Sequence, residues 1–272
     1  MEWFQALILG IVQGLTEYLP VSSSGHLEIF KDILGIELPA DENLQFDVVV
    51  HAATVLSTIV VLWPMFRDLC RSFFTFRRDE NTTYVWKLIV SCIPVGIVGV
   101  FFKSYVEEIF GSGLLIVGIC LCVTAALLLF AHLSAVRAGK LQRANAGRDI
   151  TWWDAIVIGC AQAVAVLPGL SRSGTTIATG IMLGDRRDKV ASFSFLMVII
   201  PILGEMLLDI KDIVAPDYAA QTDLLSMAVG FVAAFAVGCA ACSWMLNIVK
   251  KGKLWWFAVY CVVMGVICIL WN

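Results

Sequence analysis

"PVSSSGH", residues 20–26, separates two apolar runs near the start of the chain, WFQALILGIVQGLTEYL before it and LEIFKDILGI after it. Three hydroxyl groups, a glycine and a histidine thus interrupt a sequence that otherwise has the character of a membrane segment. Irregular backbone at membrane depth is tolerated only where protein or a water-filled cavity surrounds it. The stretch therefore predicts a broken membrane helix whose break lines a polar site.

The composition places the whole chain in a membrane. Of its 272 residues, 60% are hydrophobic and 15% are charged, whereas soluble domains carry about 25% charged residues. The formal net charge of −3 is too small to indicate a nucleic-acid partner. The nine cysteines lie nearly all in apolar runs, where small thiols pack between helices. We predict an all-α polytopic membrane protein.

Apolar runs of about 17–25 residues are long enough to cross a bilayer. The sequence contains six such runs, together with two apolar regions, about 3–35 and 153–184, that are each broken in the middle. The stretch at 20–26 is the break of the first region. The six candidate spanning segments are 46–66, 86–104, 112–132, 190–208, 224–247 and 254–271.

Charge divides the connections between these segments into two groups. Lysine and arginine gather in four connections, and cytoplasmic loops are the ones that carry such an excess. Region 153–184 then begins and ends at the cytoplasm, and it is too short for two crossings, so we expect a re-entrant helical hairpin. Region 3–35 is expected to be a second hairpin, with both chain termini outside. The basic connections lie at 67–87, 137–148, 186–189 and 250–253.

The two broken regions share an order of motifs, G-x-x-Q, then Leu-Pro, then S-x-S-G, about 149 residues apart. Each region is followed by three spanning segments, an odd number, so the two halves must lie in opposite orientations. In such inverted repeats, discontinuous helices meet near the bilayer midplane. We predict one integral membrane domain of two inverted-topology repeats, residues 1–145 and 150–272, with six spanning helices and two re-entrant hairpins in all.

The chemistry of the two breaks indicates an anion site. Pro20 and Pro168 are expected to end their helices, and the helix starting after each break would direct free N–H groups at the tip. Arg172 is costly at membrane depth, and its planar guanidinium matches two phosphate oxygens. Glu17 and His26 add a carboxylate and an imidazole. The surrounding hydroxyls are Ser22, Ser23, Ser24, Ser171, Ser173, Thr175 and Thr176.

Two simpler interpretations of these residues are weighed against the anion site. Serine and threonine in membrane helices often serve only to pack helices together. Arg172 could also do no more than neutralise Glu17 in a structural ion pair.

The segments QGLTEYLPVSSSGH (13–26) and LPGLSRSGTT (167–176) resemble the two signature motifs of the undecaprenyl pyrophosphate phosphatase family, the bacitracin-resistance proteins. The resemblance implies hydrolysis of undecaprenyl pyrophosphate to undecaprenyl phosphate plus inorganic phosphate, which recycles the lipid carrier for cell-wall synthesis. It also implies inverted repeats with re-entrant helices in the bacterial cytoplasmic (inner) membrane, with an active site facing the outer, periplasmic side. The partners implied are the polyprenyl pyrophosphate substrate and membrane lipids, and a homodimer is left open.

Carried over by motif, the catalytic candidates are Glu17, Ser23, His26 and Arg172. The resemblance further implies a divalent cation, Mg²⁺ or Ca²⁺, with Glu17 as its protein ligand. Gln13 departs from the motif, because many members have glutamate there, and this weakens a direct metal role for the position. The substrate-binding candidates are Gln13, Ser22, Ser24, Ser171, Ser173, Gly174 and Thr176.

The sequence leaves the nucleophile open among three groups. We favour the Ser23 hydroxyl, with His26 as general base, because an imidazole titrates near neutral pH. Direct attack by His26 and attack by a metal-bound water are the alternatives.

Two other functions compete with this one. Acid phosphatase-like lipid phosphatases need a second catalytic histidine after the Ser-Arg pair, but His26, His51 and His132 all precede Arg172. A transporter or flippase for a phosphorylated polyprenyl lipid is the stronger competitor, because inverted repeats with re-entrant tips are a transporter architecture.

Overall fold

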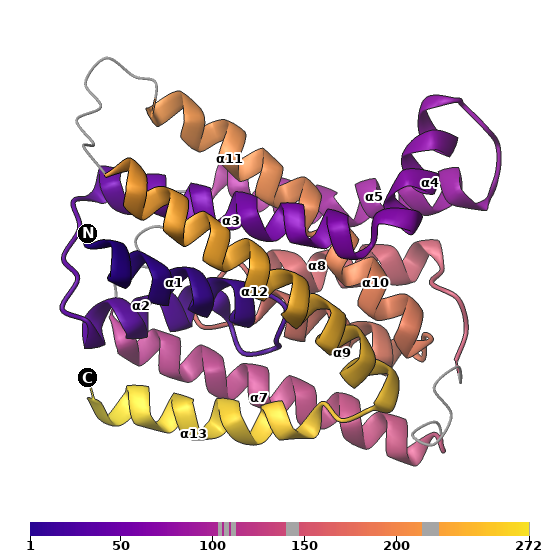
Figure 1. The fold of residues 1–272 in the computed structure, drawn as a ribbon. Coiled ribbons are helices and arrows are strands. Elements are labelled where there is room, and N and C mark those ends of the chain that lie inside the picture. The colour runs from indigo at the N-terminus through magenta and orange to yellow at the C-terminus, as the bar shows by residue number, and fades with distance from the viewer. Residues whose placement is uncertain (103–104, 106–108, 110–112, 140–146, 214–222, 272) are drawn as a thin grey trace.

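The computed structural model describes residues 1–102, 105, 109, 113–139, 147–213 and 223–271, and in this part of the chain it contains helices and no strands. This confirms the all-α prediction for the described residues. Figure 1 shows the helices packed side by side, with both termini at the same end. The helices are α1 Trp3–Thr16, α2 Ser23–Ile33, α3 Ala40–Val61, α4 Trp63–Phe74, α5 Glu80–Phe101, α7 Leu114–Arg137, α8 Trp152–Val164, α9 Arg172–Leu183, α10 Arg187–Met197, α11 Ile199–Ile213, α12 Leu224–Lys251 and α13 Trp255–Trp271.

Five helical segments are long and apolar enough to cross a membrane, namely Glu42–Val61, Glu80–Phe101, Leu114–Arg137, Arg187–Leu207 and Leu224–Lys251. They correspond to five of the six predicted spans. The sixth, 254–271, forms α13, which is apolar but has only 17 residues. That length is at the lower limit of what spans a bilayer, so the count of six spanning helices stays a prediction.

Two predicted spans have different boundaries from those expected. The span 46–66 ends at Val61, and the chain turns there into α4, which has a proline in its first turn. The span 190–208 is interrupted at Val198, between α10 and α11. Pro201 lacks the N–H that would bond to the Met197 carbonyl in a continuous helix. That carbonyl instead accepts a hydrogen bond from the Cys92 thiol at 3.3 Å.

Both broken regions fold as helix–break–helix hairpins, α1–α2 and α8–α9, whose arms pack against each other. The first helix of each hairpin was expected to end at its proline. It ends four residues earlier, at Thr16 in α1 and at Val164 in α8. The reason is the same at both sites. Pro20 and Pro168 lack the N–H that would bond to the carbonyl of those two residues, so the last helical bond cannot form.

The first arm of each hairpin packs against a long helix from the other half of the chain: α1 against α12, and α8 against α5. Glycine allows the close approach. A Cβ atom added to Gly10 would lie 2.4 Å from the Gly230 carbonyl oxygen, and one added to Gly159 would lie 2.3 Å from the Ser91 carbonyl oxygen. Gly10 and Gly159 are the two glycines of the repeated G-x-x-Q motif.

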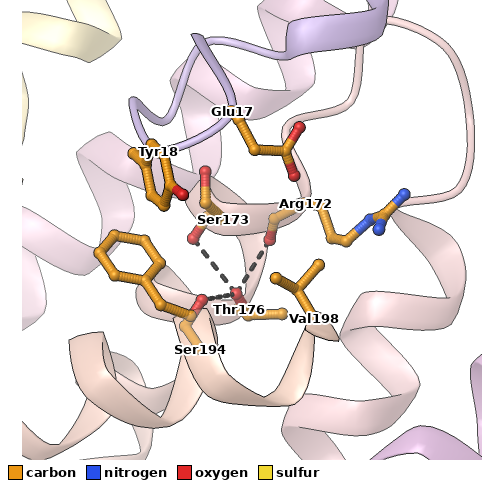
Figure 2. Close-up of a pocket in the computed structure, with 8 residues that line it drawn as sticks. Glu17, Tyr18, Arg172, Ser173, Thr176, Ser194 and Val198 are labelled. Atoms are coloured by element: carbon orange, nitrogen blue, oxygen red, sulfur yellow. Dashed lines mark hydrogen bonds between the residues drawn. The ribbon is translucent and has the colours of Figure 1, made fainter. Parts of the chain in front are cut away.

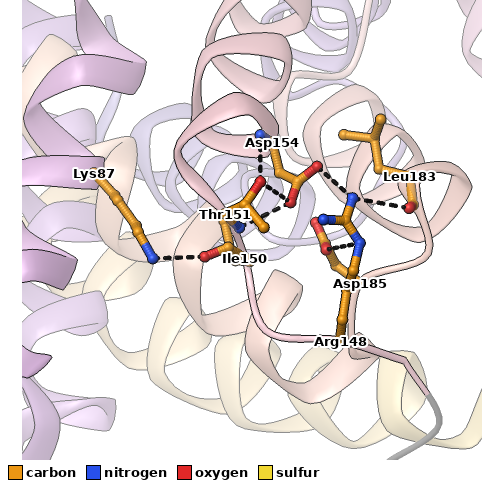
Figure 3. A network of polar contacts seen from close by, with 7 residues as sticks. All are labelled: Lys87, Arg148, Ile150, Thr151, Asp154, Leu183 and Asp185. Carbon is orange, nitrogen blue, oxygen red and sulfur yellow. Dashed lines mark hydrogen bonds and ion pairs between the residues drawn. The ribbon is translucent and has the colours of Figure 1, made fainter.

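The second hairpin is closed at its open end by a polar network (Figure 3). The guanidinium of Arg148 donates to Asp154 Oδ1 at 2.7 Å, at the start of α8, and lies 3.8 Å from Asp185 Oδ1, just after α9. Thr151 caps α8 and exchanges hydrogen bonds with the buried Asp154. The two ends of the hairpin are thus held together, as a segment that enters and leaves on one side requires.

The glycine contact gives a test of the packing. Gly159→Ala should lower the thermal unfolding midpoint in detergent, because the new methyl group overlaps backbone and overpacking costs about 1–3 kcal/mol. Gly96→Ala is the matched control, since no atom lies within 4 Å of its added Cβ, and it should be neutral or stabilising by up to about 1 kcal/mol. Equal midpoints for the two variants would contradict the close packing of α8 on α5.

Candidate active site

The breaks of the two hairpins touch each other. Ser173 Oγ donates a hydrogen bond to the Leu19 carbonyl at 3.2 Å. A Cβ added to Gly25 would lie 3.1 Å from Gly169 Cα, and one added to Gly174 would lie 3.0 Å from the Pro20 side chain. The second hairpin therefore supplies a hydrogen-bond donor to the irregular backbone of the first and packs against it, and irregular backbone at membrane depth is tolerated where protein surrounds it in this way.

The two helices that leave the breaks begin in the same way. Ser22 Oγ accepts from the Gly25 N–H at 3.3 Å, and Ser171 Oγ accepts from the Gly174 N–H at 3.0 Å. These serines, predicted to bind substrate, are thus helix N-caps. Ser22 has φ of +72°, an uncommon backbone conformation for a residue with a side chain. Ser24 and Ser173 each lie 3.4 Å, Oγ to Oγ, from their capping serine.

A pocket opens beside the contact between the breaks, and both halves of the chain line it (Figure 2). It brings together three of the predicted site residues from the second hairpin and one from the first. The lining residues are Glu17, Tyr18, Arg172, Ser173, Thr176, Ser194, Phe195 and Val198.

Glu17 is the acidic residue of this pocket, and it is held by its own hairpin. Its Oε2 accepts from Gln13 Nε2 at 3.0 Å and from Ser23 Oγ at 2.8 Å. Gln13 is fully buried, and in the described part of the chain its Oε1 has no hydrogen-bond partner. The carboxylate thus joins Gln13 and Ser23, two predicted site residues, to the pocket.

Arg172 is the first residue of α9, and in Figure 2 its guanidinium points away from the Ser173 and Thr176 hydroxyls. Its Nη1 is buried and has no hydrogen-bond partner among the residues that the structure describes. Among the described residues no ion pair joins it to Glu17, although both line the pocket. The interpretation of Arg172 as a mere structural partner of Glu17 therefore does not match the structure. A half-buried guanidinium whose buried nitrogen has no acceptor among the described residues is instead suited to an anionic ligand.

Two hydroxyls that the sequence did not single out support the second hairpin. Thr124 Oγ1, from α7, accepts from the Ser171 N–H at 3.0 Å. Ser194 Oγ, from α10, is hydrogen-bonded to Thr176 Oγ1 at 2.6 Å. The Thr176 hydroxyl also donates to the Arg172 carbonyl at 2.9 Å. Serine and threonine are common in membrane helices for packing alone, so no sequence signal separated these two from the rest.

His26 lies outside the pocket that contains Glu17 and Arg172. It is buried, and both ring nitrogens are engaged: Nδ1 with the Ser22 carbonyl at 2.8 Å and Nε2 with the Tyr260 hydroxyl at 2.7 Å. It does not line the pocket, and the hydrogen bond of the Ser23 hydroxyl goes to Glu17. The structure therefore places Glu17, and not the expected His26, where a base for Ser23 would act.

The residues present fit a hard divalent cation in one respect. In the described part of the chain no three His, Cys, Asp or Glu side chains cluster. Glu17 and the unpartnered Gln13 Oε1 nevertheless offer a carboxylate and an amide oxygen one helical turn apart. Mg²⁺ commonly uses one or two protein carboxylates and completes its shell with water and substrate phosphate.

Comparison with known proteins identifies the family. The sequence profile described as bacitracin resistance protein BacA matches residues 6–267, nearly the whole chain. The chain belongs to the BacA family. The undecaprenyl-diphosphatase of Parabacteroides distasonis is 57% identical over 270 residues, covering 99% of this chain and 98% of that protein. The proteins of the same name from Bacteroides fragilis and Christiangramia forsetii are 58% and 44% identical over 271 residues, with the same coverage. The BacA match includes the breaks of both hairpins and every residue of the pocket.

The missing hydrogen bond of Arg172 predicts that replacing this residue will not lower the thermal unfolding midpoint. Arg172→Met should keep or raise the thermal midpoint, because an apolar side chain replaces a half-buried guanidinium whose buried Nη1 makes no hydrogen bond to the described residues. Arg148→Met is the matched control, and it should lower the midpoint, because Asp154 is buried and loses a charged donor. A larger destabilisation by Arg172→Met than by Arg148→Met would show that Arg172 has a structural partner.

Proposed function

We propose that this chain hydrolyses undecaprenyl pyrophosphate to undecaprenyl phosphate and inorganic phosphate, and so returns a lipid carrier to cell-wall synthesis. Full-length relatives at 55–58% identity carry the name undecaprenyl-diphosphatase. The observation in the structure that supports it most directly is the buried, unpartnered Arg172 Nη1 in a pocket shared with Glu17. Phosphoryl transfer is catalysed mainly by positioning and charge neutralisation, and these residues can provide both.

The contacts suggest an order of events. Ser23 Oγ attacks the terminal phosphorus while its proton passes to Glu17 Oε2, at 2.8 Å. The bond from phosphorus to the bridging oxygen breaks, and undecaprenyl phosphate leaves with the electron pair. Arg172 neutralises the charge on the transferred phosphoryl group. Water then attacks the phosphoserine and passes a proton to His26. Inorganic phosphate is released as the bond from phosphorus to Ser23 Oγ breaks, and Ser23 Oγ takes back the proton held by Glu17.

A divalent cation would be held by Glu17 and by Gln13 Oε1. When bound, Mg²⁺ or Ca²⁺ supplies further neutralisation of the pyrophosphate. Gln13 contributes a neutral ligand where a glutamate would contribute a charged one, so we expect weaker binding of the ion than at a site with two carboxylates.

We also infer how the chain lies in the bacterial cytoplasmic membrane. The N-cap serines at equivalent positions of the two hairpins, and the packing of each hairpin on a helix of the other half, support two inverted repeats, residues 1–145 and 150–272. Figure 1 shows the termini at the end opposite the connections that carry basic residues, so the termini would lie on the periplasmic side. The family resemblance adds that the pocket opens to that side. A homodimer stays a prediction.

The decisive measurement is release of inorganic phosphate from undecaprenyl pyrophosphate by the purified protein. We expect release by the wild type, loss of activity with a chelator, and a loss of about 10³–10⁵-fold in Arg172→Met. Arg148→Met, assayed below its unfolding midpoint, should keep its activity. Binding of the lipid without phosphate release would favour a transporter or flippase instead.

The nucleophile can be identified by rapid chemical quenching with the terminal phosphate radiolabelled. An acid-stable label on Ser23 is expected, and Ser23→Ala should be nearly inactive, because no other hydroxyl contacts the Glu17 carboxylate among the described residues. Ser243→Ala is a matched control, since the exposed Ser243 hydroxyl bonds, among the described residues, only to the Cys239 carbonyl of its own helix. An acid-labile label would identify His26 as the nucleophile, and the absence of any label would favour water.

A further inference from the structure

The side chains of His26 and Tyr260 form a pair between the first hairpin and the last helix of the chain, α13. The distance from His26 Nε2 to the Tyr260 hydroxyl is 2.7 Å. The two rings are also stacked, with centroids 5.6 Å apart and planes inclined by 16°. The residues are 234 positions apart in sequence, so only the fold brings them together.

The hydrogen bonds assign the roles of the two ring nitrogens. The Ser22 carbonyl, 2.8 Å from Nδ1, can only accept, so Nδ1 carries a proton. In the neutral ring Nε2 is therefore the acceptor, and the Tyr260 hydroxyl donates to it. When His26 is protonated, the same hydroxyl oxygen can accept from Nε2–H, because a phenol is both donor and acceptor. Tyr260 thus keeps a hydrogen bond to the imidazole in both charge states.

The neighbouring residue of α13 holds the same break. Cys261 is buried, and its thiol contacts the Pro20 carbonyl at 3.5 Å. The consecutive residues Tyr260 and Cys261 therefore bind the side chain of His26 and the backbone at the tip of the first hairpin. Tyr260 itself is exposed on the outside of the bundle, so its ring meets the surroundings while its hydroxyl faces the histidine.

We propose that Tyr260 is a positioning residue for His26: with the Ser22 carbonyl on Nδ1 and the Tyr260 hydroxyl on Nε2, the imidazole is held in one orientation and one tautomer. This inference rests on the proposed function, in which Glu17 takes the Ser23 proton and His26 accepts a proton from the water that hydrolyses the phosphoserine. A hydrogen bond at one nitrogen alone would leave the ring free to tilt about it. Groups that orient a metal-bound histidine are typically worth about 10–100-fold in activity, and we expect an effect in that range here.

The test uses Tyr260→Phe, which retains the stacked ring and removes only the hydroxyl. We expect kcat for phosphate release to fall by about 10–100-fold with little change in KM. Tyr84→Phe is the matched control, because the buried Tyr84 hydroxyl has no hydrogen-bond partner to lose. An unchanged or increased kcat in Tyr260→Phe would overturn the proposal.

Two further readouts separate positioning from a merely structural role. In a His26→Asn background, Tyr260→Phe should cause no additional loss, since a residue that acts through His26 has nothing left to position. The ¹⁵N resonance of His26 Nε2 should also move toward that of a free lone pair in Tyr260→Phe and stay in place in Tyr84→Phe. An unmoved resonance contradicts the pair even if the chain hydrolyses undecaprenyl pyrophosphate. If the wild type does not hydrolyse the lipid but the His26 resonance does shift in Tyr260→Phe, the result would contradict the proposed function alone.

Discussion

The contact between the two helix breaks is the interaction on which the rest of the structure depends. Each hairpin leaves backbone groups without helical partners, and lipid offers none. The Leu19 carbonyl of one break meets the Ser173 hydroxyl of the other, and Gly25 lies against Gly169. Helices α7 and α13 add partners from outside, through Thr124 on Ser171 and Cys261 on Pro20. The pocket lies beside the contact between the breaks. The packing of the two breaks against each other therefore also brings the site residues together from both halves of the chain.

The site divides its charges between the hairpins. The first contributes a carboxylate that is already hydrogen-bonded, through Gln13 and Ser23. The second contributes a guanidinium, on Arg172, with a buried nitrogen that bonds to nothing. An acid paired with this cation would satisfy both groups and remove the reason for an anion to enter. Keeping them in one pocket without an ion pair preserves a free positive charge for phosphate.

Much of this arrangement was predictable from the sequence, because proline, glycine and serine have local effects. The two breaks, their hairpins and the meeting of Glu17 with Arg172 in one pocket followed from short motifs. Contacts between distant segments did not. Tyr260 stands in an apolar helix with no polar neighbours in sequence, so nothing indicated its bond to His26. The interruption at Val198 was also missed, because a proline inside a predicted span does not by itself show where the helix breaks: α5 continues through Pro94, whereas near Pro201 the Met197 carbonyl bonds to Cys92 from α5.

The buried nitrogen of Arg172 has a consequence for finding ligands. A fold that carries an unmet hydrogen bond is less stable than it would be with that bond formed, and any ligand that binds only the folded chain stabilises it. Small bisphosphonates and other diphosphate mimics that bind the guanidinium should therefore be detectable, because they raise the melting temperature of the detergent-solubilised protein. Inhibitor candidates could then be ranked by heat resistance alone, before any of the scarce lipid substrate is prepared.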